Sequence, residues 1–385
     1  MCAVKKSPLL NMPIKLILTN NGVSYFLSHG KKLARIKLAN NHEQYGVKLM
    51  NFTPQSIQRM ILLDYIAHIE VSAAAFSAFT SEFVDLAKVL VYSLLYKQFD
   101  SQVFSEIIET ECVKKHNRSY PTELLDRQTA IDEGTLRTCL ANKQEIIAMA
   151  RKKILEPLWD RILSDAELSP DEKNVHTFLS EKFLNRLSLL NWYLIIKFFN
   201  TEGFAEILPV LQNTLDVYME KSRTSDYIAM LLAELSFSCE NANITTLARE
   251  KIADRAHIAS AVTDSTVRAK LIQELAARQQ FIYVMWTIGG GTGSIGKQGR
   301  LRISLYTHDD SVDSSKIDAA RLNGKTAGLA DYCRELALTQ KNTDLCFYYL
   351  TCLDEMCKKR NIKLESMVNR STVNNVTILN LTVNF

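Results

Sequence analysis

Glycine and proline are scarce in this chain, and the glycines that occur are concentrated in one place. The 385 residues include 7 prolines and 13 glycines, and five of the glycines fall between Gly289 and Gly296. Proline interrupts a helix through its missing N–H, and glycine through its conformational entropy. Their scarcity elsewhere predicts long helices, and from about residue 73 to residue 222 the apolar residues recur with helical spacing.

Both ends of the chain carry strand patterns. Near the N-terminus, Asn and Gly separate three short apolar runs: IKLILTNN, KKLARIKLAN and YGVKLMNFT. Towards the C-terminus, FIYVMWTI and RLRISLYT flank the glycines, and IKLESMVN and VTILNLTVNF suggest a hairpin around RSTVNN. In the last run Leu379, Leu381, Val383 and Phe385 alternate with polar residues, which predicts a half-buried strand.

These patterns predict an α+β protein that is rich in helix and has three parts. Residues 1–70 are expected to form a small β module with a closing helix. Residues 71–224 are expected to form a helical domain. Residues 225–385 are expected to form an α/β, sandwich-like domain that ends in the β-hairpin. A chain of this length has room for two or three domains.

Several short motifs predict where helices begin. Thr53-Pro54 combines an N-cap residue with a proline in the first turn, and the amphipathic pattern that follows continues through LLDYIAHIE. Residues 169–172, Ser-Pro-Asp-Glu, form a capping box with proline at the first helical position. The segment Thr263–Thr266 predicts a break and a new helix start.

The composition excludes several classes of protein. A hydrophobic fraction of 47% and a charged fraction of 23% are ordinary for a soluble globular protein. The net charge of +4, without interleaved aromatic and basic residues, gives no reason to expect nucleic-acid binding. The best apolar run, 187–199, contains Asn191 and Lys197 and is shorter than the roughly 20 residues that cross a membrane.

The cysteines and histidines give no metal or disulfide framework. None of the eight cysteines forms a C-x-x-C pair, and the seven histidines are scattered. The N-terminus lacks the features of a signal peptide, because Asn11, Pro13 and Lys15 interrupt its apolar stretch. A cytoplasmic protein with reduced cysteines and no metal is therefore expected.

The glycine cluster satisfies two nucleotide-binding patterns at once. Gly291, Gly293 and Gly296 form G-x-G-x-x-G, and the run from Gly291 to Lys297 forms G-x-x-x-x-G-K. Both motifs require a helix after the loop, and a strand pattern follows here. A flexible connection between two strands is the favoured interpretation. The alternative is a phosphate site in which Lys297, Arg300 and Arg302 bring positive charge near the glycine amides.

The stretch YGVKLMNFTPQSIQRMILLDYI (45–66) resembles the closing strand and helix of PilZ domains, which are cyclic-di-GMP receptors. The nearest match to that family's R-x-x-x-R ligand motif is Lys31 and Arg35. The segment 41–46 has the spacing of its second motif, with Glu43 in place of serine. The resemblance implies a degenerate module of this type that contacts a protein.

The C-terminal part resembles GHKL ATPases and histidine-kinase catalytic domains in its order of helix, strands, polar loop, helix and hairpin. That family places a Glu and an Asn on one helix, with the Asn on magnesium. In YIAMLLAELSFSCENAN the candidates are Glu234 and Asn241, but Ser238 and Phe237 stand at their partner positions. The resemblance implies a GHKL-like fold without catalysis.

We therefore interpret the chain as a non-enzymatic, bacterial-type signalling or regulatory protein that acts through a protein partner. Two alternatives stay open. One is an ATP- and magnesium-binding protein of GHKL type that uses Glu234, Asn241 and the glycine loop. The other is a cyclic-di-GMP receptor of PilZ type that uses Lys31 and Arg35.

Overall fold

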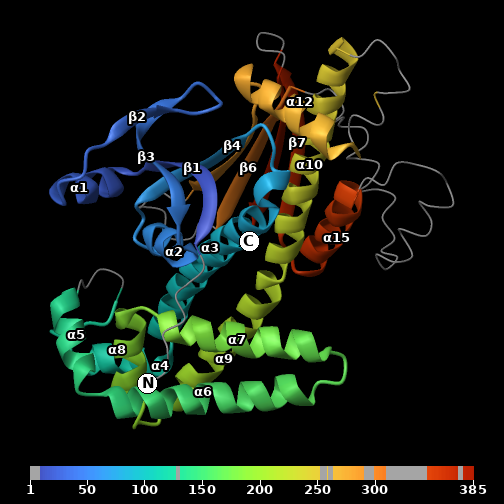
Figure 1. Cartoon of the computed structure of the whole chain (residues 1–385). Helices are drawn as coiled ribbons and strands as arrows, with labels where there is room; N and C mark the ends of the chain where they lie inside the picture. Colours follow the sequence, from blue (N-terminus) through green and yellow to red (C-terminus); the bar gives the residue numbers. More distant parts are fainter. Residues whose placement is uncertain are drawn as a thin grey trace, which may run out of the picture. The chain divides into compact units, whose positions relative to one another are not determined.

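A computed structural model describes residues 9–126, 131–251, 258, 263–289, 299–308, 345–371 and 376–385. The chain forms two compact units (Figure 1). The sheet unit comprises Met1–Leu94 and Arg223–Phe385, and the helical unit comprises Leu95–Ser222. Each is described below by itself.

The sheet unit is built on one antiparallel sheet, which has eight strands among the described residues in the order β2-β3-β1-β4-β5-β6-β8-β7 (Figure 1). The strands are β1 Leu10–Leu18, β2 Ala34–Lys37, β3 Glu43–Phe52, β4 Ile66–Ala73, β5 Ile282–Gly289, β6 Arg300–Thr307, β7 Lys363–Ser371 and β8 Val376–Asn384. Strands from the two ends of the sequence meet where β4 pairs with β5. The first and last parts of the chain therefore share one sheet.

Helices cover one face of this sheet, where α10 (Thr224–Lys251), α15 (Leu345–Lys359) and the start of α3 (Thr80–Ile108) lie (Figure 1). Alternate strand residues point to that face and are apolar, as a half-buried sheet requires. Trp286 of β5 is fully buried there, with its ring centroid 5.5 Å from that of Phe83 in α3. This face holds a core of the sheet unit.

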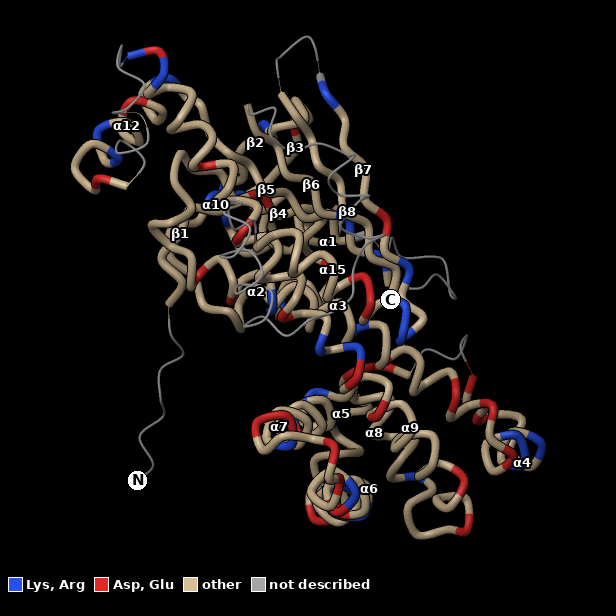
Figure 2. The backbone as a smooth tube through the Cα atoms, turned by 90° about the vertical axis from the view of Figure 1, so that its right-hand side faces the viewer, with Lys and Arg blue, Asp and Glu red and all other residues tan. Residues whose placement is uncertain are grey.

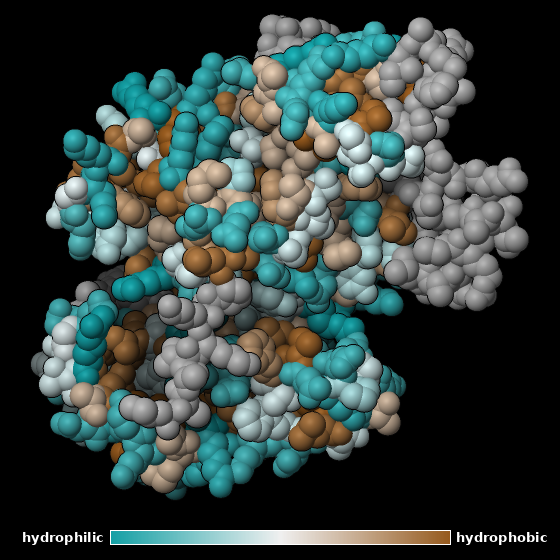
Figure 3. Space-filling view, viewed as in Figure 1, coloured by the Kyte–Doolittle hydropathy of each residue, from teal (hydrophilic) through white to brown (hydrophobic). Residues whose placement is uncertain are grey.

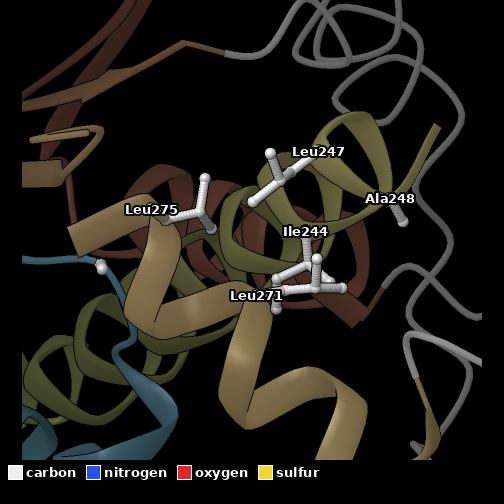
Figure 4. Close-up of a cluster of buried hydrophobic side chains, with 6 residues drawn as sticks. Ile244, Leu247, Ala248, Leu271 and Leu275 are labelled. Atoms are coloured by element: carbon white, nitrogen blue, oxygen red, sulfur yellow. The ribbon is translucent and has the colours of Figure 1, made fainter. Parts of the chain in front are cut away.

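The remaining described helices of the sheet unit are α1 (Asn20–Ser28), α2 (Pro54–Leu62) and α12 (Ser265–Ala277), with a short 3-10 turn at Ser77–Phe79. As predicted, Thr53 caps α2 by accepting from the Ser56 N–H, and proline occupies the first turn. Asp264 caps α12 in the same way. Figure 4 shows the apolar cluster that joins α10 and α12, made of Ile244, Leu247, Ala248, Leu271 and Leu275 together with Ala74.

The helical unit contains the rest of α3 and six further described helices: α4 Glu111–Ser119, α5 Glu133–Ala141, α6 Gln144–Ser164, α7 Pro170–Arg186, α8 Leu189–Phe198 and α9 Phe204–Ser222. Part of its core is aromatic, because the Tyr218 ring packs on Phe183 and Phe99 at centroid distances of 4.7 and 5.9 Å. The predicted capping box of Ser169 and Glu172 opens α7. α7 ends at Arg186, and Ser188 caps the next helix, α8.

Charged residues are distributed differently in the two units. Along α6 and α7, Lys and Arg alternate with Asp and Glu (Figure 2). In the sheet, β5 and β8 carry no charged residue, whereas β2, β6 and β7 each carry two or more. On the face shown in Figure 3, hydrophobic residues surface as separate patches among hydrophilic ones.

The predicted fold class is confirmed, since the protein is α+β and rich in helix. The predicted division into three parts is corrected. Residues 1–70 and 225–385 are joined in one sheet and belong to one unit, and the helical domain is narrower than 71–224. The two parts are joined by the pairing of β4 with β5, in which Ala73 lies opposite Ile282. Local sequence patterns do not reveal a pair of strands so far apart in the chain.

The helix expected to run from Pro54 to about residue 70 is also corrected. It ends at Leu62, and Asp64 takes a left-handed backbone conformation with φ of 58°. Such a residue stops a helix. The following residues, Ile66–Ala73, form β4, which lies between β1 and β5. Pairing on both sides thus overrides the helical periodicity of this segment.

Candidate functional site

The sheet face opposite the helices carries polar side chains in a cross-strand row. Strand registers align His68 with Thr287, Thr287 with Arg302, Arg302 with Thr382, and Thr382 with Glu365. Because residues directly opposite each other in an antiparallel sheet point to the same face, these five side chains form one row. We call this face the polar face.

A pocket of about 410 Å³ lies at one end of the polar face. Its described lining consists of Arg300, Arg302, Glu365, Ser366, Met367, Asn380 and Thr382. These residues come from β6, β7 and β8, which are consecutive in the sheet. The pocket floor is therefore regular sheet, which holds the side chains in a fixed order.

Arg300 and Arg302 are the cations of this pocket. Both are exposed, and neither guanidinium has a hydrogen bond or an ion pair with another described residue. Their α-carbons are roughly 7 Å apart, the spacing of residues i and i+2 on a strand. A guanidinium presents five donors in a planar fork that matches a carboxylate or a phosphate. The two arginines can thus approach one oxyanion from neighbouring positions.

The neighbouring side chains add donors and control the local charge. The Ser304 hydroxyl donates to Asn380 Oδ1 at 2.7 Å, which leaves the Asn380 NH2 group as a donor. Glu365 lies 2.6 Å from Lys363. The hydrogen bond and charge of Lys363, with Arg300 adding to them, lower the pKa of Glu365. The ionised carboxylate of Glu365 is thus balanced by Lys363, and the positive charges of Arg300 and Arg302 remain in the pocket.

His68 lies at the far end of the row. Its Nδ1 is 3.1 Å from Thr287 Oγ1. Burial and the nearby His42 lower the pKa of His68, so its neutral form is favoured. A neutral His68 leaves Arg302 as the cation of the row at neutral pH.

The strands predicted on either side of the glycine cluster are confirmed as β5 and β6, and Gly289 pairs directly with Arg300. Gly291, Gly293, Gly296 and Lys297 lie outside the described residues. The register nevertheless places Arg300 next to the start of the loop. The sequence therefore identified Arg300 and Arg302 but not the residues of β7 and β8 that complete the pocket.

Glu234 and Asn241, the pair expected from the GHKL resemblance, both lie on α10. Asn241 Oδ1 accepts a hydrogen bond from Arg268 at 2.7 Å. Arg268 also pairs with Glu240, which is fully buried and accepts from the backbone N–H and hydroxyl of Ser77. Asn241 thus belongs to a network that ties α10 to α12 and to the residues before α3.

Lys31 and Arg35, the pair expected from the PilZ resemblance, lie before and within β2 and are exposed. The Arg35 guanidinium stacks over the Tyr45 ring at 5.7 Å. Gly46 of the GVK segment sits where β1, β2 and β3 are paired, and a β-carbon there would be 2.2 Å from Leu16 O. This glycine therefore serves the close approach of two strands.

Sequence patterns did not indicate the buried pair of Glu70 and Lys15 on the polar face. Glu70 is fully buried, and its carboxylate accepts from Lys15 Nζ at 2.5 Å and from the Ala39 N–H at 2.8 Å. An apolar cluster of Ile17, Ile36, Leu38, Met285 and Tyr306 lies beside it.

The comparisons with known proteins place the chain in a family. A family model described as a family of unknown function, DUF8084, matches residues 5–385. The chain belongs to this family. It is 32% identical over 389 residues to an uncharacterized protein of Treponema pallidum (strain Nichols), covering the full length of both chains. No solved structure matches it.

No helix in the described part of the chain combines the length and the apolar character needed to cross a membrane. Among the described residues there is likewise no group of three or more His, Cys, Asp and Glu side chains that could hold a metal ion. The cysteines that the structure describes are free thiols. The candidate site is the pocket on the polar face, which Arg300 and Arg302 line.

Proposed function

We propose that the protein is a non-enzymatic regulatory protein that binds an oxyanion-bearing small ligand on the polar face and acts through a protein partner. The observation that carries this proposal is the pair Arg300 and Arg302. Both guanidinium groups line the pocket without a hydrogen bond or ion pair to a described residue, and the nearby carboxylate of Glu365 pairs with Lys363 at 2.6 Å. Asn380 and Thr382 stand beside them as hydrogen-bonding groups.

The two neighbouring guanidinium groups repel each other, and an anion bound between them would replace this repulsion with attraction. Charge-assisted hydrogen bonds to a carboxylate or phosphate are about twice as strong as neutral ones. A volume of about 410 Å³ is within the range of small-molecule sites. A phosphate group on a small organic body is the ligand chemistry that fits both charge and size.

ATP is an alternative ligand, because it also carries phosphate groups that the arginines can bind. Its support is the register that brings Arg300 next to the glycine loop. The GHKL role of Asn241 has less support, because the side-chain oxygen that would bind magnesium already accepts from Arg268. Cyclic-di-GMP is the other alternative, and Arg35 at Tyr45 is the residue on which it rests.

Calorimetric titration with pyrophosphate, ATP–magnesium and cyclic-di-GMP tests the proposal. Binding of at least one phosphate compound is expected, and Arg302→Gln is expected to weaken it about 10- to 100-fold, the effect of one charged hydrogen-bonding group. Arg35→Gln is the matched control, because it removes an exposed arginine of the same sheet outside the pocket.

Each outcome separates the alternatives. If Arg302→Gln weakens binding and Arg35→Gln does not, the pocket is supported. If Arg35→Gln weakens binding of cyclic-di-GMP and Arg302→Gln does not, the PilZ-type receptor is supported. ATP hydrolysis that disappears in Asn241→Ala would show an enzyme and contradict the proposal. Absence of binding by all three phosphate compounds would also contradict it.

A further inference from the structure

The third strand has an open edge over half of its length. β3 runs from Glu43 to Phe52, but β2 pairs only with residues 43–46 of it. On the other side β1 pairs with β3 from Gly46 to Phe52. Across 47–52, no backbone hydrogen bond from a described residue reaches the side of β3 away from β1. Alternate residues of this segment therefore present N–H and C=O groups that another strand can pair with.

The side chains of the open edge fall into two kinds. Lys48 and Met50 are exposed on the polar face, Met50 at 64%. Val47 and Leu49 point to the opposite face and are only half-buried. A further strand would cover Val47 and Leu49 on one face and lie beside Lys48 and Met50 on the other.

The charge around the edge is strongly positive. Between residues 31 and 52 the chain has five cations, Lys31, Lys32, Arg35, Lys37 and Lys48, and one carboxylate, Glu43. All five cations are exposed. The β2–β3 ribbon therefore attracts an acidic segment and repels a basic one.

A second copy of the chain is a poor occupant of this edge. Antiparallel pairing of two β3 edges brings the two basic ribbons together, and like charges across strands are destabilising. We infer that the open edge of β3 binds an extended acidic segment of a partner protein by strand addition, with acidic residues opposite Lys48 and apolar residues opposite Val47 and Leu49. In this mode backbone hydrogen bonds give affinity and the alternating side chains give specificity.

The test uses the full-length protein and a pool of nine-residue peptides in which Glu alternates with Val or Ile. Binding is followed by fluorescence anisotropy, and backbone hydrogen exchange is followed with and without peptide. Binding is expected together with slowed exchange of edge amides in residues 47–52. Lys48→Glu is expected to weaken binding at least tenfold. Lys270→Glu, the same charge change at an exposed lysine of α12 outside the β2–β3 ribbon, is expected to weaken it less than threefold.

Two peptide controls sharpen the result. Peptides with Lys in place of Glu, and Glu peptides N-methylated on alternate residues, are both expected to lose binding. Failure of every acidic peptide to bind, binding without protection of residues 47–52, or protection of that segment by self-association without peptide would overturn the inference. The inference rests on the proposed partner-binding role and not on the pocket. Arg302→Gln should therefore leave peptide binding unchanged, and the two proposals can fail separately.

Discussion

Charged side chains are buried at one end of the polar face and exposed at the other. Around Glu70 the charge is buried, paired with Lys15 and accompanied by a backbone donor from Ala39. Around Arg302 the charges are exposed, and the described residues supply no partner for either arginine. We call these the closed end and the open end. At the closed end an ion pair joins β1 and β4, and the open end is where we propose that a ligand binds.

This contrast explains why the same face contains both apolar and polar residues. At the closed end Leu38, from the end of β2, packs with Met285 and Tyr306 of β5 and β6 and excludes water from Glu70. Burial also raises the pKa of Tyr306, and the negative charge of Glu70 adds to the rise. At the open end Met367 is 58% exposed. The substitutions below test whether the ends differ in stability as they differ in burial.

Glu70→Gln is expected to have the largest effect, a loss of about 3 kcal/mol in the free energy of unfolding, because breaking a buried pair leaves Lys15 without its counter-charge. The glutamine NH2 also replaces one of two acceptors, so either Lys15 or the Ala39 N–H loses its hydrogen bond. Urea denaturation of the sheet unit measures this loss. Glu365→Gln is the control at the open end, and its effect should be much smaller, because its pair with Lys363 is exposed to solvent. Equal losses in both variants would contradict the comparison.

Leu38→Ala is expected to rank second, with a loss of about 2–3 kcal/mol. Leu38 is 3% exposed, and its removal leaves a cavity in the cluster beside Glu70. Thermal unfolding followed by circular dichroism measures the change, with Met367→Ala at the open end as the control. Equal shifts of the melting temperature in Leu38→Ala and Met367→Ala would show that the closed end is not packed more tightly than the open end.

The sequence predicted much of the fold but little of this contrast. Thr53, Ser169 and the alternation from Leu379 to Phe385 are local signals, and the structure confirms all three. The pairing of β4 with β5 has no local signal, and β4 itself was expected to be helical. Without that pairing, the row from His68 to Glu365 cannot be assembled from the sequence. Arg300 and Arg302 were found because they adjoin the glycine cluster, whereas Glu70 and Asn380 acquire their roles only through neighbours on distant strands.

His68, on the same strand as Glu70, gives a pH-dependent effect of intermediate size. Burial lowers its pKa from the ordinary 6.5, so the unfolded chain takes up a proton before the folded chain does. Stability is therefore expected to fall as the pH drops below about 6.5 and to stop falling below the folded pKa. The slope from one group is less than about 1.4 kcal/mol per pH unit. Urea denaturation between about pH 5 and pH 8 should show a smaller slope in His68→Gln. A slope of stability against pH that is unchanged in His68→Gln would show that another group is responsible. Burial also lowers the pKa of His116, but its contribution is the same in the variant and the wild type and therefore cancels.

Arg302→Gln is expected to have the smallest effect on stability, a change within about 0.5 kcal/mol and towards greater stability in low salt. The substitution removes a cation next to Arg300, and no ion pair with a described residue is lost with it. Sites that keep unsatisfied charge for a ligand commonly trade stability for function. Melting temperatures in low and high salt measure the effect, because added salt screens the repulsion and should reduce the difference between variant and wild type. A loss of more than about 1 kcal/mol would show that Arg302 has a structural partner, and the open end would then resemble the closed one.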